Sequence, residues 1–203
     1  MEKLVARIIS LIFHPLLIPT YLIASLIYMD AFFAFVIPDD ARIKIILLVF
    51  MTSALFPVMV LFGMYRLRLV TSMRMDSREE RLYPYVATSI FFFLTYYLVW
   101  KANLSPVFYY CLLGASILAI LTLLINFRWK ISAHTVSMGG VIGAFVGLQS
   151  VLLIDMLFQL SVSILIAGLV GYARLKVGKH TQAQVYAGYF LGFAVLYLLI
   201  LYY

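Results

Sequence analysis

Long apolar runs separated by short polar breaks fill this 203-residue chain. A helix that crosses a membrane needs about 20 consecutive apolar residues. The pattern predicts spans at residues 4–29, 45–65, 85–100, 107–127 and 132–149, a sixth ending near Tyr172 after a tight turn at Asp155, and a last one at 185–203. The sequence therefore predicts an all-α, polytopic transmembrane helical bundle of six to seven spans. One membrane-embedded domain covers residues 1–203.

The first of these runs has two interpretations. His14-Pro15 and Pro19 interrupt it, and proline breaks or kinks a helix. The run either crosses as a kinked helix or dips into the membrane as a re-entrant piece, which would leave six spans. His14 itself is more simply interpreted as a structural histidine than as part of a substrate groove.

Composition narrows the class of protein. The chain is 66% hydrophobic and only 11% charged, whereas soluble domains have about 25% charged residues. The single cysteine, Cys111, excludes an intramolecular disulfide and a thiolate cluster for zinc. In a soluble protein the net charge of +7 would suggest nucleic acid. Between membrane spans it indicates loop charges that set topology and an anionic partner, so we expect membrane lipids and no nucleic acid.

The basic residues lie mostly on one side of the predicted bundle. With seven crossings, one side holds 12 of the 15 Lys and Arg residues: Lys3, Arg7, Arg66, Arg68, Arg74, Arg78, Arg81, Arg128, Lys130, Arg174, Lys176 and Lys179. Only Arg42, Lys44 and Lys101 lie on the other side. The positive-inside rule places the richer side in the cytoplasm.

Three polar clusters on this basic side suggest a phosphate site. They lie at residues 74–84, 130–135 and 174–184. The clusters contain arginines, which bind phosphate oxygens in pairs of hydrogen bonds, and His134 and His180, which suit nucleophilic or acid–base chemistry near neutral pH. Glycines repeat every four residues after each histidine, at Gly139-Gly143-Gly147 and Gly188-Gly192. Such spacing predicts close helix packing that brings the two histidines together.

The spacing of these clusters resembles the type 2 phosphatidic acid phosphatase superfamily. The family pattern is Lys-x6-Arg-Pro, then Pro-Ser-Gly-His, then Ser-Arg-x5-His-x3-Asp. This chain has Arg74-x6-Arg81 with Pro84, then Ser132-Ala133-His134, then Arg174-x5-His180-x3-Gln184. The resemblance covers roughly residues 74–188, and its third motif is the most specific.

The resemblance implies a role for each matching residue. His180 would attack phosphorus and form a phosphohistidine, and His134 would protonate the leaving oxygen. Phosphate would be held by Arg74, Arg81, Ser132 and Arg174, to which we add Lys130 from its place beside Ser132. The expected activity is hydrolysis of a lipid or isoprenoid phosphate monoester or diphosphate, with no cofactor and no metal site. Metal independence also follows from the lack of paired carboxylates near the histidines.

The chain departs from the family at several positions. Arg74 replaces Lys, Pro84 stands two residues late, and Gln184 replaces the acidic residue that orients the nucleophile. The Gln184 carbonyl oxygen can still accept an imidazole N–H, but it lacks the negative charge that stabilises imidazolium. A catalytically weak or inactive lipid-phosphate binder or carrier is therefore the alternative. A membrane prenyltransferase would need two Asp-rich metal motifs, and residues 75–80 are a poor match.

The sequence also predicts the membrane in which the protein lies and the side that its site faces. The chain should be an integral protein of the plasma (inner) membrane with a lipid or isoprenoid phosphate as substrate. Charge bias places the site in the cytoplasm, whereas many bacterial members of the resembled family face the periplasm. The sequence sets neither the lipid tail and headgroup nor the oligomeric state.

Overall fold

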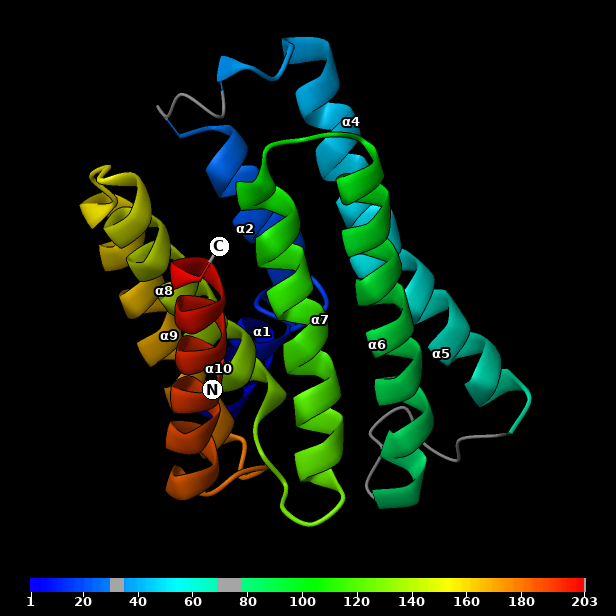
Figure 1. The fold of residues 1–203 in the computed structure, drawn as a ribbon. Coiled ribbons are helices and arrows are strands. Elements are labelled where there is room, and N and C mark those ends of the chain that lie inside the picture. The colour runs from blue at the N-terminus through cyan, green and yellow to red at the C-terminus, as the bar shows by residue number, and fades with distance from the viewer. Residues whose placement is uncertain (30–34, 69–77, 203) are drawn as a thin grey trace.

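The computed structural model describes residues 1–29, 35–68 and 78–202, with the backbone alone at residues 78–81. Six helical segments in these ranges are long and apolar enough to cross a membrane. They are the continuous run of α4 (Asp39–Phe50), η1 (Met51–Leu55) and α5 (Phe56–Arg66), followed by α6 (Arg78–Lys101), α7 (Pro106–Asn126), α8 (Ala133–Leu152), α9 (Leu157–Lys176) and α10 (Gln182–Leu201). The described residues include no strand, and the predicted all-α polytopic bundle is confirmed (Figure 1).

The connections between the long helices gather at two opposite ends of the bundle (Figure 1). The proximal end holds residues 127–132 and 177–181, and the distal end holds residues 102–105 and 153–156. The tight turn predicted near Asp155 is confirmed. Leu153 adopts a left-handed conformation at the end of α8, and Asp155 Oδ1 accepts the Leu157 N–H at 2.8 Å. That bond satisfies a free donor in the first turn of α9.

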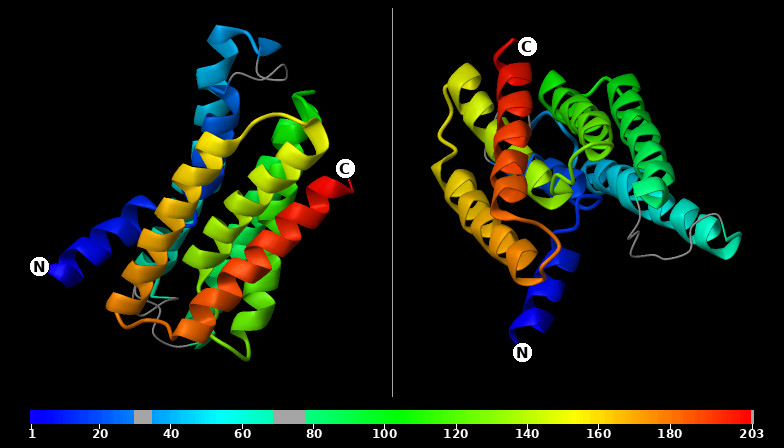
Figure 2. Two further views of the ribbon diagram at one scale, coloured as in Figure 1. Left: turned by 90° about the vertical axis from the view of Figure 1, so that its left-hand side faces the viewer. Right: turned by 90° about the horizontal axis from the view of Figure 1, so that it is seen from below.

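The first apolar run forms two short helices instead of one continuous span. α1 (Glu2–Ile12) and α2 (Ile18–Ile27) are separated by residues 13–17, where Pro15 and the following Pro19 limit helix continuation. α1 projects sideways from the bundle, whereas α2 runs alongside the long helices (Figure 2). α1 packs on α9, and its buried residues are Ala6 and Ser10. Glu2 pairs with Lys176 of α9.

Hydroxyl groups fix α2 against the neighbouring helices. Ser53 Oγ donates to the Leu16 carbonyl at 3.2 Å and lies 3.4 Å from Thr20 Oγ1. Thr95 on α6 donates to Thr52 at 2.8 Å. Thr52 and Ser53 both lie in η1, the widened turn that precedes Pro57. Side-chain hydrogen bonds of this kind join helices in a setting without water, so the break after α1 is held in a defined place.

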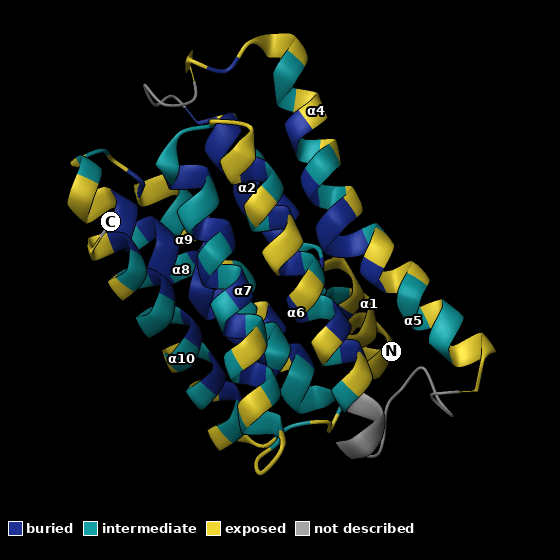
Figure 3. Cartoon of the chain, turned by 45° about the vertical axis from the view of Figure 1, so that its right-hand side comes forward, coloured by how far each residue is buried: buried dark blue, intermediate teal, exposed yellow. Residues whose placement is uncertain are grey.

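Glycines bring α8 and α10 into backbone contact, as the spacing predicts. A Cβ on Gly139 would lie 2.2 Å from the Tyr189 carbonyl oxygen, and one on Gly192 would lie 1.9 Å from that of Val136. No larger side chain fits such an approach. Figure 3 shows α8 as a largely buried helix. Large apolar residues are exposed on α5 and α10, as on lipid-facing helices. Packing of the two glycine faces sets the first turns of α8 and α10 side by side.

Candidate functional site

A polar cavity of about 570 Å³ lies at the proximal end of the bundle. Its walls come mainly from the α1–α2 break, the first part of α6, the α7–α8 connection, the end of α9 and the α9–α10 connection. The described side chains that line it include these basic and amide groups: Arg7, His14, Asn126, Lys130, His134, Arg174, Lys179 and His180. None of the described lining residues is Asp or Glu. A cavity with this lining is electrostatically suited to an anion.

His180 stands immediately before α10, where Thr181 caps the helix. His180 Nδ1 lies 3.3 Å from the Lys130 carbonyl oxygen. A carbonyl can only accept, so Nδ1 carries the hydrogen and Nε2 of the neutral ring keeps its lone pair. Burial lowers the pKa of His180 to about 4, with a further lowering from Arg174, while the bond to Lys130 opposes both. His180 therefore has the tautomer and charge of a nucleophile at neutral pH.

His134 is the second residue of α8, and its ring reaches the end of α1. His134 Nε2 lies 3.0 Å from the Ser10 carbonyl oxygen, which has to accept a hydrogen from the ring. The Ser10 carbonyl belongs to the last turn of α1, where helix carbonyls lack partners within the helix. The interaction therefore ties α1 to α8. In the neutral ring of His134 it leaves Nδ1 with the lone pair.

Arg174 and Ser132 bring buried polar atoms that have no partner among the described residues. Arg174 lies in the last turn of α9, and its Nε has no hydrogen bond. Ser132 is fully buried at the start of α8, and its Oγ has none either. Buried polar atoms are rarely left unpaired unless a ligand or water completes them. Both residues were predicted to bind phosphate. Arg174 lines the cavity, whereas Ser132, whose sequence neighbours Ile131 and Ala133 line it, is not among the lining residues.

Gln184 takes part in a capping box at the start of α10. Its Oε1 accepts the Thr181 N–H at 3.1 Å, and the Thr181 hydroxyl accepts the Gln184 N–H at 3.4 Å. The Lys130 carbonyl, and not Gln184 alone, therefore orients the His180 ring. The Gln184 side chain contributes a smaller effect that raises the pKa of His180.

The structure describes only part of the first predicted cluster, residues 74–84. Arg74 lies outside the described residues, and so does the side chain of Arg81. Pro84 and Tyr85, in the same stretch of α6, line the cavity. Lys130, His134, Arg174 and His180 come together there as predicted, while the phosphate-binding roles of Arg74 and Arg81 remain predictions.

Four basic or amide residues that were not assigned to the site also line the cavity: Arg7, His14, Asn126 and Lys179. The sequence favours a structural role for His14 over one in a substrate groove. In the structure its ring centroid lies 5.4 Å from that of His134, at an interplanar angle of 80°. The sequence signal that could have found it is the His14-Pro15 break within an apolar run, since an ionisable residue at membrane depth is a functional candidate.

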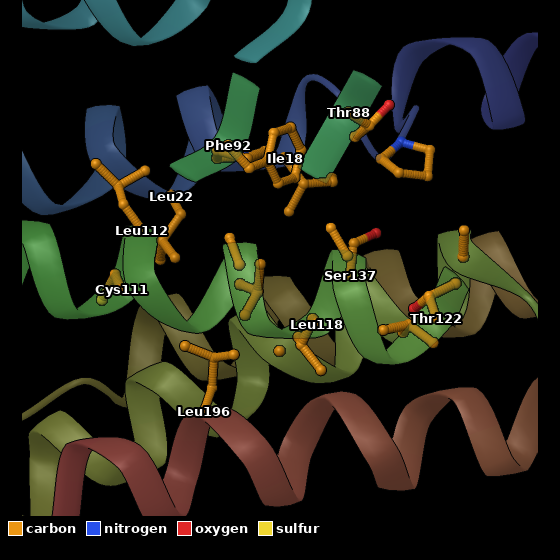
Figure 4. Close-up of a pocket in the computed structure, with 18 of the residues that line it drawn as sticks. Ile18, Leu22, Thr88, Phe92, Cys111, Leu112, Leu118, Thr122, Ser137 and Leu196 are labelled. Carbon is orange, nitrogen blue, oxygen red and sulfur yellow. The ribbon is translucent and has the colours of Figure 1, made fainter. Parts of the chain in front are cut away.

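A second, apolar groove of about 80 Å³ adjoins the polar cavity. Figure 4 shows side chains of α2 and α6, such as Ile18 and Phe92, on one side of it and those of α7, α8 and α10 on the other. Four residues line both spaces: Pro15, Tyr85, Thr88 and Ala133. None of the described lining residues of the groove is charged. The two spaces therefore suit the two ends of an amphiphile.

The described residues contain no group of three or more His, Cys, Asp or Glu arranged to hold a metal ion. Comparison with protein-family models, with curated proteins and with solved structures found no match to this chain.

Proposed function

We propose that this protein is a membrane phosphatase that hydrolyses a lipid or isoprenoid phosphate monoester or diphosphate through a phosphohistidine. One observation carries the proposal: His134, Arg174 and His180, from sequence clusters far apart, line one cavity without a described carboxylate. Within it the Nε2 lone pair of His180 is kept available by the bond from Nδ1 to Lys130. This arrangement supports the resemblance to the type 2 phosphatidic acid phosphatases.

The proposed reaction has two steps. His180 Nε2 attacks phosphorus, so that an N–P bond forms while the P–O bond to the leaving group breaks. His134 Nδ1 receives the proton of the singly protonated phosphate group and gives it to the leaving oxygen. A water molecule then attacks the phosphohistidine, His134 takes a proton from it, and the N–P bond breaks to release phosphate. Arg174, Lys130 and Ser132 would stabilise the charge on the phosphoryl oxygens throughout.

The apolar groove supports a lipid substrate over a water-soluble one. It begins at the wall that it shares with the cavity and is lined by apolar side chains such as Leu22, Phe92 and Leu118. A hydrocarbon chain attached to a phosphate in the cavity would leave water on entering it, which is favourable. The tail would then lie between α2, α6, α7 and α8.

A non-catalytic lipid-phosphate binder or carrier is the second candidate. The observation that favours it is the capping role of Gln184, because no described carboxylate accompanies His180 in the cavity to stabilise imidazolium. Phosphate release from a panel of lipid phosphates by the purified protein, assayed in chelator, separates the two. Release that is lost in His180→Ala supports the phosphatase. Binding without release supports the carrier.

Metal independence is part of the proposal and is tested in the same assay. Chelator should leave phosphate release unchanged. Activity that disappears in chelator and returns with magnesium would overturn this part.

The membrane side of the site is proposed from charge alone. Most Lys and Arg residues belong to the proximal end, which the positive-inside rule places in the cytoplasm. Exposed Leu67 and Ala102 lie at opposite ends of the bundle and can be replaced by cysteine in a Cys111→Ser background. An impermeant maleimide applied to intact spheroplasts should label position 102 and not 67. The reverse pattern would place the site outside.

A further inference from the structure

His14 is held in a fixed place by the interrupted N-terminal segment. It lies between α1 and α2, where Ser53 binds the Leu16 carbonyl two residues later. Its ring meets that of His134 edge to face and lines the polar cavity together with Arg174 and His180. No part of the resemblance assigns a residue from this segment.

The hydrogen bonds of His14 define which nitrogen is available. The Leu16 N–H donates to His14 Nδ1 at 3.3 Å, so Nδ1 is the acceptor and the hydrogen of the neutral ring is on Nε2. Burial, with a further effect from Arg174, lowers the pKa of His14 to about 4, which keeps the ring neutral near pH 7. His14 therefore offers one neutral N–H donor.

The adjacent His134 offers the complementary group. Its Nε2–H is engaged by Ser10, so its Nδ1 is an acceptor. The described structure contains no hydrogen bond between the two rings. One donor and one acceptor therefore lie side by side in a cavity lined by Lys130 and Arg174. A phosphate that carries one proton presents the matching pair, an acceptor oxygen and a hydroxyl, whereas sulfate at neutral pH has no hydroxyl to donate.

We propose that His14 is a phosphate-binding residue that donates Nε2–H to one phosphoryl oxygen, while His134 Nδ1 accepts from a protonated one. This inference rests on the proposed function only in taking phosphate as the ligand of the cavity. It specifies that the site binds the singly protonated phosphate group. His14 thus acts as a neutral donor and needs no change of charge.

Inorganic phosphate and sulfate are the probes, titrated calorimetrically into the purified full-length protein at pH 7. His14→Gln keeps a neutral N–H donor near the position of Nε2, and His14→Phe keeps a ring against His134 without the donor. We expect the Kd for phosphate to rise about tenfold in His14→Phe, the size of one hydrogen bond to a charged acceptor. In His14→Gln it should rise less than about threefold. Sulfate should bind the wild type at least about tenfold more weakly than phosphate.

Each alternative outcome has a separate meaning. Unchanged binding in His14→Phe, or equal losses in both variants with both still monodisperse, would show that His14 only packs. Equal affinity for sulfate and phosphate would overturn the pairing with His134. If the predicted binding pattern appears in a protein that hydrolyses no lipid phosphate, this inference holds and the phosphatase proposal fails. Hydrolysis that depends on His180 without the His14 pattern would have the opposite meaning.

Discussion

The polar cavity and the apolar groove share a wall but have opposite chemistry. The cavity is lined by three histidines and four Lys or Arg residues. The groove is lined by apolar residues and a few hydroxyl groups. The cavity forms where the α7–α8 connection and the last turn of α1 present backbone carbonyls to partly buried histidines. The groove forms where small residues such as Ala115, Ala119 and Gly140 leave space between helices.

This difference indicates that the cavity would recognise the phosphate of a substrate and the groove its tail. Changes in the cavity should affect every substrate, because each substrate carries a phosphate. Changes in the groove should affect only substrates with a long tail. The four predictions below test that division.

The largest effect is expected from His180→Ala. Without the nucleophile, phosphate release should fall at least about 1,000-fold for both a long-chain lipid phosphate and p-nitrophenyl phosphate. Initial rates on the two substrates measure the effect, and an unchanged melting temperature shows that the fold is intact. Activity within about tenfold of the wild type on either substrate would exclude His180 as the nucleophile.

Arg174→Gln should lower kcat/KM about 100-fold, as expected when a donor to a transition-state oxygen is lost. It should also change the pH profile. The pKa of His180 is lowered to about 4 partly by Arg174, and the neutral ring is the reactive form. The wild type should therefore keep its activity on acidification until the pH approaches that value. In the variant the pKa of His180 rises, so activity should be lost at a higher pH.

Lys176→Gln is the matched control for this prediction. Lys176 lies two residues after Arg174 but pairs with Glu2 and does not line the cavity. Its replacement should not change the pH at which activity is lost on acidification. An identical shift in both variants would mean that general surface charge, and not Arg174, sets the pKa of His180.

Ala119→Phe should separate the groove from the cavity. A phenyl ring on this groove-lining residue should raise the KM for a long-chain lipid phosphate about tenfold, since a few methylene groups lose their burial. Hydrolysis of p-nitrophenyl phosphate should change less than about twofold, since that substrate has no tail. Ile120→Phe, on the exposed side of the same helix, is the control. Equal losses on both substrates would argue against a tail-binding groove.

Gln184→Asp is expected to have the smallest effect. It should preserve turnover or raise it a few-fold, because a carboxylate one turn after His180 would stabilise the imidazolium. Aspartate also remains compatible with the first turn of α10. Steady-state rates on a lipid phosphate measure the change. A collapse of turnover in a folded protein would show that the capping role of Gln184 matters more than the motif alignment suggests.

Features that depend on local pattern were predictable from the sequence. Long apolar runs predict six to seven spans because a helix in lipid has to satisfy its own backbone, and six of these runs form helices long enough to cross. The turn at Asp155 follows from the length of the run that contains it. Glycines every four residues predict the contact of α8 with α10 and hence the meeting of His134 with His180. The resemblance to a phosphatase family pointed to the same two histidines, and its functional part stays a proposal.

Only the tertiary structure decides which nitrogen of each histidine is available. His180 is oriented by the carbonyl of Lys130, 50 residues away, and His134 by that of Ser10, 124 residues away. A backbone carbonyl has no signature in the sequence, since every residue has one. The same holds for His14, whose place depends on where α1 ends and on the bond from Ser53 to Leu16. Residue types and spacing thus identify which groups this protein has, while contacts between distant segments assign each group a hydrogen or a lone pair.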